Sequence, residues 1–173
     1  MDSTLPLETE PSEPAPSDRI AKTSKPEHRG LLEEILDKRQ LEAHFQPILD
    51  LKSGEILGYE GLIRGPVDTP LHRPVDLFRA ANKHGYALRL ERLCRQTVLE
   101  SFARHGLAHK LFLNVRPQCL ALPGLGTAAT RELLKRLGLI PERIVIELTE
   151  NLPFFDFSSV RAALTNYRNL GFS

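Results

Sequence analysis

Three residues whose side-chain oxygens could bind a metal ion occupy similar places in the expected strands. Glu60, Asn114 and Glu147 each lie toward the C-terminal end of a short apolar run. A carboxylate in a buried strand is costly unless it is paired or binds a metal ion. In a barrel of parallel strands these ends converge on one face, where active sites form. Two carboxylates and an amide oxygen suit Mg²⁺ or Mn²⁺ better than zinc, although polar groups at strand ends also commonly cap loops.

The first of these residues belongs to a predicted β-hairpin. Apolar runs at residues 45–51 and 56–63 flank the polar stretch Lys52-Ser53-Gly54-Glu55. Ser-Gly in a short gap between β-prone runs is a hairpin signal. Such a gap is too short for a parallel crossover, so the two strands should be antiparallel. Glu60 and Arg64 then place an acid and a base near the end of the second strand.

Beyond the hairpin, short apolar strands alternate with helical segments, which is typical of βα units and a parallel sheet. A complete eight-stranded barrel takes about 250 residues, so four strands and the start of a fifth fit the first half of a barrel. In the clearest helix, Cys94 lies in the apolar stripe as a small buried hydrophobe, while Glu91 is assigned to the solvent face. We expect helices from residue 31 and at 75–84, 88–105, 124–137 and 157–170, and strands at 110–115, 143–149 and from residue 171.

Composition narrows the class of protein. The chain has 173 residues, of which 41% are hydrophobic and 26% charged, and this is typical of a globular domain. Its net charge of +1 gives no reason to expect polymeric nucleic acid or an acidic membrane as a partner. Neither a signal core nor an apolar run of about 18 residues is present, so we expect a cytoplasmic chain without a membrane segment. Residues 1–29 are rich in proline, serine and charge and are predicted to be disordered, with a folded domain at residues 30–173.

Three short motifs resemble one known family. Gln46-Pro47-Ile48 and Gly58-Tyr59-Glu60-Gly61-Leu62-Ile63-Arg64 resemble the opening of EAL-domain proteins, the bacterial cyclic di-GMP phosphodiesterases. The Glu-Ala-Leu motif of the family appears here as Glu60-Gly61-Leu62. Asn114-Val115-Arg116-Pro117 is similar to the family's Asn-x-Ser-Pro stretch, with Arg116 in place of a small hydroxyl residue. Glu147-Leu148-Thr149-Glu150 resembles a later motif, and the resemblance covers residues from about 31 to 173.

The resemblance implies a fold and a set of site residues. The fold is a (β/α)8 TIM-like barrel with an antiparallel first strand, of which this chain would be the N-terminal part, truncated before the family's Asp-Asp-Phe-Gly stretch. Glu150 would support the loop after the following strand. The paired aspartates and the general-base lysine of the family are absent from this chain. The remaining implied residues are the metal ligands Glu60, Asn114 and Glu147 and the substrate-binding residues Gln46, Leu62 and Arg64.

The implied reaction is the metal-dependent hydrolysis of cyclic di-GMP to linear pGpG. The complete domain would use two Mg²⁺ or Mn²⁺ ions, and the isolated chain should be inactive. The complete protein would bind cyclic di-GMP, form a homodimer and carry an additional sensor or GGDEF domain. Two alternatives stay open: a degenerate EAL domain that acts as a cyclic di-GMP receptor, and an inactive interaction module.

Overall fold

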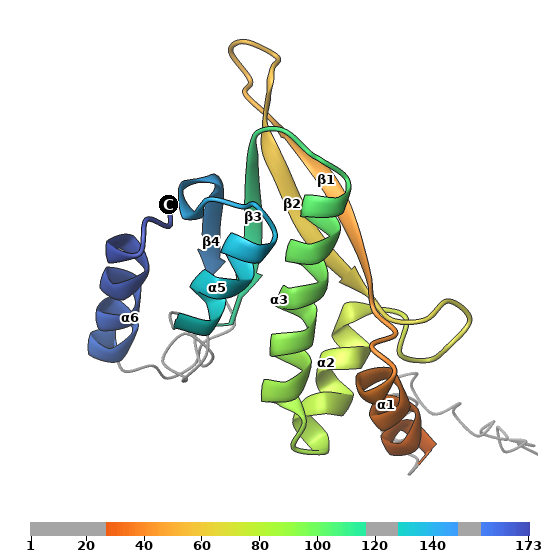
Figure 1. Ribbon diagram of the computed structural model, residues 1–173. Helices are drawn as coiled ribbons and strands as arrows, with labels where there is room; N and C mark the ends of the chain where they lie inside the picture. The colour runs from red at the N-terminus through yellow and green to blue at the C-terminus, as the bar shows by residue number, and fades with distance from the viewer. Residues whose placement is uncertain (1–26, 117–127, 149–156) are drawn as a thin grey trace, which may run out of the picture.

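The structure is a computed structural model that describes residues 27–116, 128–148 and 157–173 (Figure 1). Its four strands are β1 (Glu42–Leu49), β2 (Ile56–Arg64), β3 (Lys110–Val115) and β4 (Ile144–Leu148). Its helices are α1 (Glu27–Asp37), α2 (Pro74–Lys83), α3 (Ala87–Arg104), α5 (Ala128–Arg136), the 3-10 turn η2 (Pro141–Arg143) and α6 (Phe157–Asn169).

The strands form one mixed sheet in the order β1-β2-β3-β4. β1 is antiparallel to β2, whereas β2, β3 and β4 run parallel to one another. The turn of the hairpin is held by Asp50, whose carboxylate accepts the backbone N–H groups of Lys52 and Ser53 at 2.7 and 3.1 Å. Gly54 completes the turn with φ +72°, a conformation that glycine adopts without steric cost. The predicted antiparallel hairpin is therefore confirmed.

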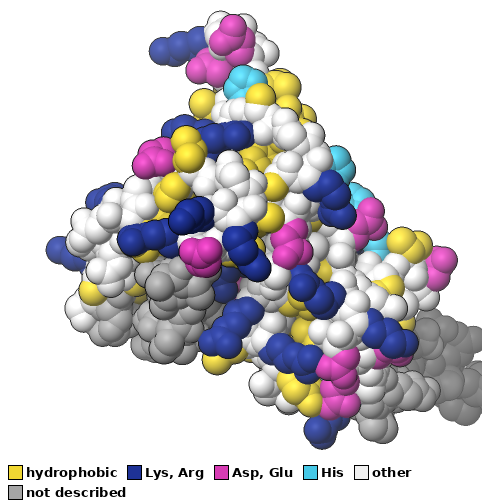
Figure 2. All heavy atoms as spheres, viewed as in Figure 1, with side chains coloured by type: hydrophobic (Ala, Val, Ile, Leu, Met, Phe, Trp, Pro, Cys, Tyr) yellow, Lys and Arg dark blue, Asp and Glu magenta, His cyan; other side chains and the backbone are white. Residues whose placement is uncertain are grey.

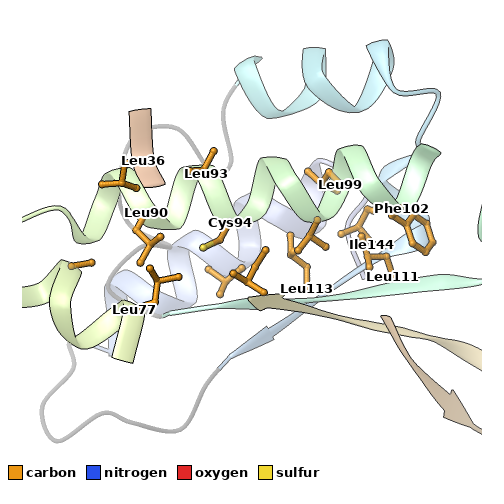
Figure 3. Close-up of a cluster of buried hydrophobic side chains, with 14 of the residues drawn as sticks. Leu36, Leu77, Leu90, Leu93, Cys94, Leu99, Phe102, Leu111, Leu113 and Ile144 are labelled. Atoms are coloured by element: carbon orange, nitrogen blue, oxygen red, sulfur yellow. The ribbon is translucent and has the colours of Figure 1, made fainter. Parts of the chain in front are cut away.

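The core lies between the sheet and the helices on one of its faces (Figure 1). Helix α3 supplies more of it than any other described element, and its Leu90, Cys94 and Phe102 lie on the side of the helix that faces the sheet (Figure 3). Cys94 is among the buried residues of α3, as predicted. Burial raises the pKa of the Cys94 thiol far above its usual range, and the nearby charge of Glu91 adds to this effect. The thiol is therefore a packing group.

The surface of the helical layer carries charges of both signs. Figure 2 shows Lys and Arg side chains interspersed with acidic and hydrophobic ones on this face. Several are held in ion pairs, such as Arg89 with Asp37 and Arg39 with Glu100. Among the described residues, no helix is both long enough and apolar enough to cross a membrane.

Most predicted elements are present, with three corrections. α1 begins at Glu27, four residues before the predicted start, so residues 27–29 are helical and do not belong to the predicted disordered tail. β1 begins at Glu42, three residues before the predicted start. Its polar side chains Glu42, His44 and Gln46 are exposed and alternate with half-buried ones, so no continuous apolar run marks the beginning of the strand. The third correction concerns Glu91, which is expected on the solvent face of its helix but is buried, with 7% of its surface exposed.

The last residues of the chain join the sheet. The backbone N–H of Ser173 donates to the carbonyl of Ile144 at 3.0 Å, and its carbonyl accepts the N–H of Ile146 at 3.1 Å. These two bonds place Ser173 alongside β4, where the predicted further strand would begin, while the sheet itself has four strands in the described residues. The predictions for the tail before residue 27 and for residues 124–127 fall outside the described residues.

Candidate functional site

The candidate site lies on the face of the sheet that faces away from α3. A Cβ atom at Gly61 would contact Val98 of α3, so Gly61 faces the helix. Because side chains alternate along a strand, Glu60, Leu62 and Arg64 project from the opposite face. All three are half-buried. This face carries no helix from the described part of the chain (Figure 1).

Four polar side chains form a row across this face, one from each strand. Gln46 of β1 is the register partner of Glu60 of β2, and Asn114 of β3 is the register partner of Glu147 of β4. The amide Nδ2 of Asn114 donates a hydrogen bond to Oε1 of Glu60 at 2.7 Å, which joins the two halves of the row. The sheet therefore brings the three predicted metal ligands together.

The electrostatics of the row also fit a cation. Burial raises the pKa of Glu147, and the charge of Glu60 raises it further. Two carboxylates that repel each other across a partly buried surface are stabilised by a positive charge between them. Among the described residues, no group of three or more His, Cys, Asp and Glu side chains is placed to hold a metal ion. An ion at this site would therefore need the oxygen of Asn114 as well as the two carboxylates, and all three are hard ligands suited to Mg²⁺ or Mn²⁺.

The predicted substrate-binding residues lie around this row. Gln46 is exposed at one end of it, and Leu62 and Arg64 follow Glu60 on the same face of β2. The Nη1 atom of Arg64 donates to the backbone carbonyl of Ile63 at 2.8 Å. Glu60 is the fifth of the nine residues of β2, so it lies in the middle of its strand and not toward the C-terminal end as predicted. Glu150 lies outside the described residues.

Sequence reasoning missed a polar cluster behind the row. Arg116 follows the end of β3 and forms an ion pair with the buried carboxylate of Glu91 on α3. Its Nη1 atom donates to Oδ1 of Asn82 at 3.1 Å, and its guanidinium lies 4.8 Å from the ring centre of Phe78. The position of Glu91 directly beside the apolar stripe of its helix, next to Leu90, was the available signal that this carboxylate is buried.

Comparison with known proteins identifies the family. The sequence model of the EAL domain matches residues 29–173. An uncharacterised signalling protein of Caulobacter vibrioides is 30% identical over 82% of this chain and 17% of its own length. A probable cyclic di-GMP phosphodiesterase of Escherichia coli, PdeB, is 27% identical over 88% of this chain and 30% of its own length. The chain thus spans less than a third of each of these curated relatives.

Solved structures show the same fold. The EAL domain of FimX from Xanthomonas citri, in complex with c-diGMP, superposes with a TM-score of 0.70 at 19% identity. The superposition covers 83% of this chain and 57% of that one. BlrP1 of Klebsiella pneumoniae, in a manganese and cyclic diGMP complex, superposes with a TM-score of 0.64 at 24% identity, over 77% of this chain and 33% of its own. The mixed sheet with an antiparallel first strand is therefore part of a TIM-like barrel, and the chain belongs to the EAL domain family.

Proposed function

We propose that this chain supplies one half of the active site of a cyclic di-GMP phosphodiesterase. The observation that carries the proposal is the row of Gln46, Glu60, Asn114 and Glu147, which four strands bring to one face of the sheet. The name of the Escherichia coli relative and the cyclic di-GMP in the FimX and BlrP1 structures support the choice of substrate. The reaction would hydrolyse one phosphodiester bond of cyclic di-GMP to give linear pGpG.

In this proposal the row holds a divalent cation, Mg²⁺ or Mn²⁺, through Glu60, Asn114 and Glu147. A bound cation supplies a water of lowered pKa and neutralises charge on the phosphate. The manganese in the BlrP1 structure supports this choice of ion. The hydrogen bond from Asn114 to Glu60 orients both side chains before any ion arrives, which reduces the cost of assembling the site.

The neighbouring residues would hold the dinucleotide. Arg64 presents a guanidinium, whose forked donors match a phosphate group. Gln46 would donate or accept hydrogen bonds at the edge of the site, and Leu62 would pack against the ligand. Glu150 would support a loop beside the site.

We further propose that full activity requires the later strands of the EAL domain, which in the family carry the paired aspartates and the general-base lysine. Two chains would form a homodimer, with a sensor or GGDEF domain in the same protein and a cytoplasmic location.

The test is an assay of the protein with its complete EAL domain. Purified protein should convert cyclic di-GMP to pGpG, measured by chromatography, only when Mg²⁺ or Mn²⁺ is present. Activity should disappear with a chelator and return when the ion is added back. Tight binding of cyclic di-GMP without any pGpG would reject the enzyme and favour the receptor. Failure to bind cyclic di-GMP under any metal condition would leave only the interaction module.

A further inference from the structure

The guanidinium of Arg116 is held on three sides by residues of two helices. The carboxylate of Glu91 on α3 forms an ion pair with Nε of Arg116, and Oδ1 of Asn82 on α2 accepts a hydrogen bond from Nη1 at 3.1 Å. The ring of Phe78, also on α2, lies 4.8 Å from the guanidinium carbon, within the range of a cation–π contact. Both charged side chains are largely shielded, with 22% of the Arg116 side chain and 9% of the Glu91 side chain exposed. The side chain of Arg116 is therefore held in place by its contacts with α2 and α3.

The position of Arg116 in the chain links its contacts with the helices to the candidate site. Arg116 is two residues after Asn114 and one residue after the last residue of β3. The point at which the chain leaves β3 is thus attached to the helical layer. Asn114 lies just before this point, and its amide group donates to Glu60.

We propose that Arg116 and Glu91 are a pair of positioning residues for Asn114. The pair fixes the backbone at the end of β3 and so holds the amide of Asn114 beside Glu60. Neither residue is among the proposed ligands of the ion. The inference rests on the proposed function, because it assigns the pair a role toward a metal ligand. Residues that orient metal ligands commonly change metal affinity or activity by about 10–100-fold when they are replaced.

The inference is tested by replacing Arg116 with methionine, which keeps an unbranched stem but removes the charge and the donors. Glu91 would then be a buried carboxylate without its partner, and such a residue is strongly destabilising. A second variant, Glu91→Leu combined with Arg116→Met, removes both charges and so avoids that penalty. The folded double variant keeps an apolar contact between positions 91 and 116 but lacks the ion pair and the hydrogen bonds of Arg116.

The matched control is Arg89→Met. Arg89 is also an arginine of the helical layer, and its ion pair with Asp37 joins α3 to α1 without reaching β3. Each protein carries its complete EAL domain and is titrated with Mn²⁺ alone, with free Mn²⁺ followed by electron paramagnetic resonance. Amide hydrogen exchange of the backbone at Val115 and Arg116 is measured on the same metal-free samples.

The Arg116 variants should bind Mn²⁺ at least about tenfold more weakly than the parent, and a high Mn²⁺ concentration should restore their turnover. Their amides at the end of β3 should exchange faster, whereas Arg89→Met should match the parent in both measurements. Parent-like Mn²⁺ affinity in a folded Arg116 variant would overturn the positioning role while leaving the proposed function intact. A parent protein that binds no Mn²⁺ would reject the proposed metal site and the positioning role with it.

Discussion

Gly61 lies so close to Val98 that any side chain at position 61 would clash with it. A Cβ atom at Gly61 would lie 2.4 Å from Cγ1 of Val98, well inside contact distance. Val98 is 2% exposed and belongs to the core of α3. The glycine of the Glu60-Gly61-Leu62 motif is thus matched to the helix that packs behind the strand.

Gly61→Ala, which restores the family's Glu-Ala-Leu sequence, should therefore destabilise this protein. Overpacking of a filled core typically costs about 1–3 kcal/mol. Val98→Ala creates room behind the strand, so the double variant should recover part of the loss, with a coupling free energy of roughly 0.5–3 kcal/mol. Chemical denaturation of the four proteins measures this cycle. Strictly additive effects would show that the contact does not determine the choice of glycine.

Glu60→Ala should abolish hydrolysis in the protein with its complete domain while leaving the fold intact. Loss of a metal ligand removes several kcal/mol of transition-state stabilisation, on the order of a 1,000-fold loss of kcat. Production of pGpG is the measurement, and circular dichroism checks the fold. Glu55→Ala is the control, because Glu55 is an exposed carboxylate in the turn of the same hairpin. Undiminished turnover by Glu60→Ala would exclude Glu60 from the site.

Arg64→Lys should weaken substrate binding more than metal binding. Lysine keeps the charge but lacks the forked donors, and the loss of one charge-assisted hydrogen bond corresponds to about a tenfold rise in KM. The Mn²⁺ concentration for half-maximal activity should stay unchanged. Kinetics at varied cyclic di-GMP and varied Mn²⁺ separate the two effects. If neither KM nor kcat moves, Arg64 does not contact the phosphate.

Glu147→Gln should make the metal-free protein more stable at neutral pH. The pKa of Glu147 is raised above 4.5, first by burial and then by Glu60, so the folded state holds this proton more tightly than the unfolded chain. The stability gained from the protonated carboxyl is fully present below the unfolded pKa and is lost as the pH rises through the raised pKa. Glutamine cannot lose a proton and keeps that contribution.

Thermal melts with a chelator measure this difference, which should disappear below about pH 4. Added Mn²⁺ should reverse the order at neutral pH, because the ion stabilises the protein only when the ligand is a carboxylate. A variant that melts below the parent at neutral pH without metal would show that Glu147 is not under charge repulsion.

Cys94 should be inert to alkylating reagents in the folded protein. Its buried thiol has a strongly raised pKa, and the thiolate is the reactive form. In a Cys119→Ser background, labelling of Cys94 should therefore follow global unfolding across a denaturant series. Fast labelling under native conditions would show that this part of α3 opens locally.

The hairpin and the candidate ligands could be predicted from the sequence because their signals are local. The Ser53-Gly54 turn lies between two apolar runs, and Glu60 lies in one of them. The ion pair of Glu91 with Arg116 could not be predicted in this way, since the two residues are 25 positions apart and no spacing links them. The row across the sheet likewise depends on register, which side-chain patterns restrict but do not specify for parallel strands.

The sheet described above pairs every strand with the one that precedes it in the chain, from β1 to β4 and on to Ser173. During synthesis, each of β2, β3 and β4 therefore finds the preceding strand with which it pairs already made. Domains generally begin to fold from the N-terminus as they are made, at about 5–20 residues per second. The order of strands in this sheet thus allows the ligands to be assembled one at a time, in the order Glu60, Asn114 and Glu147.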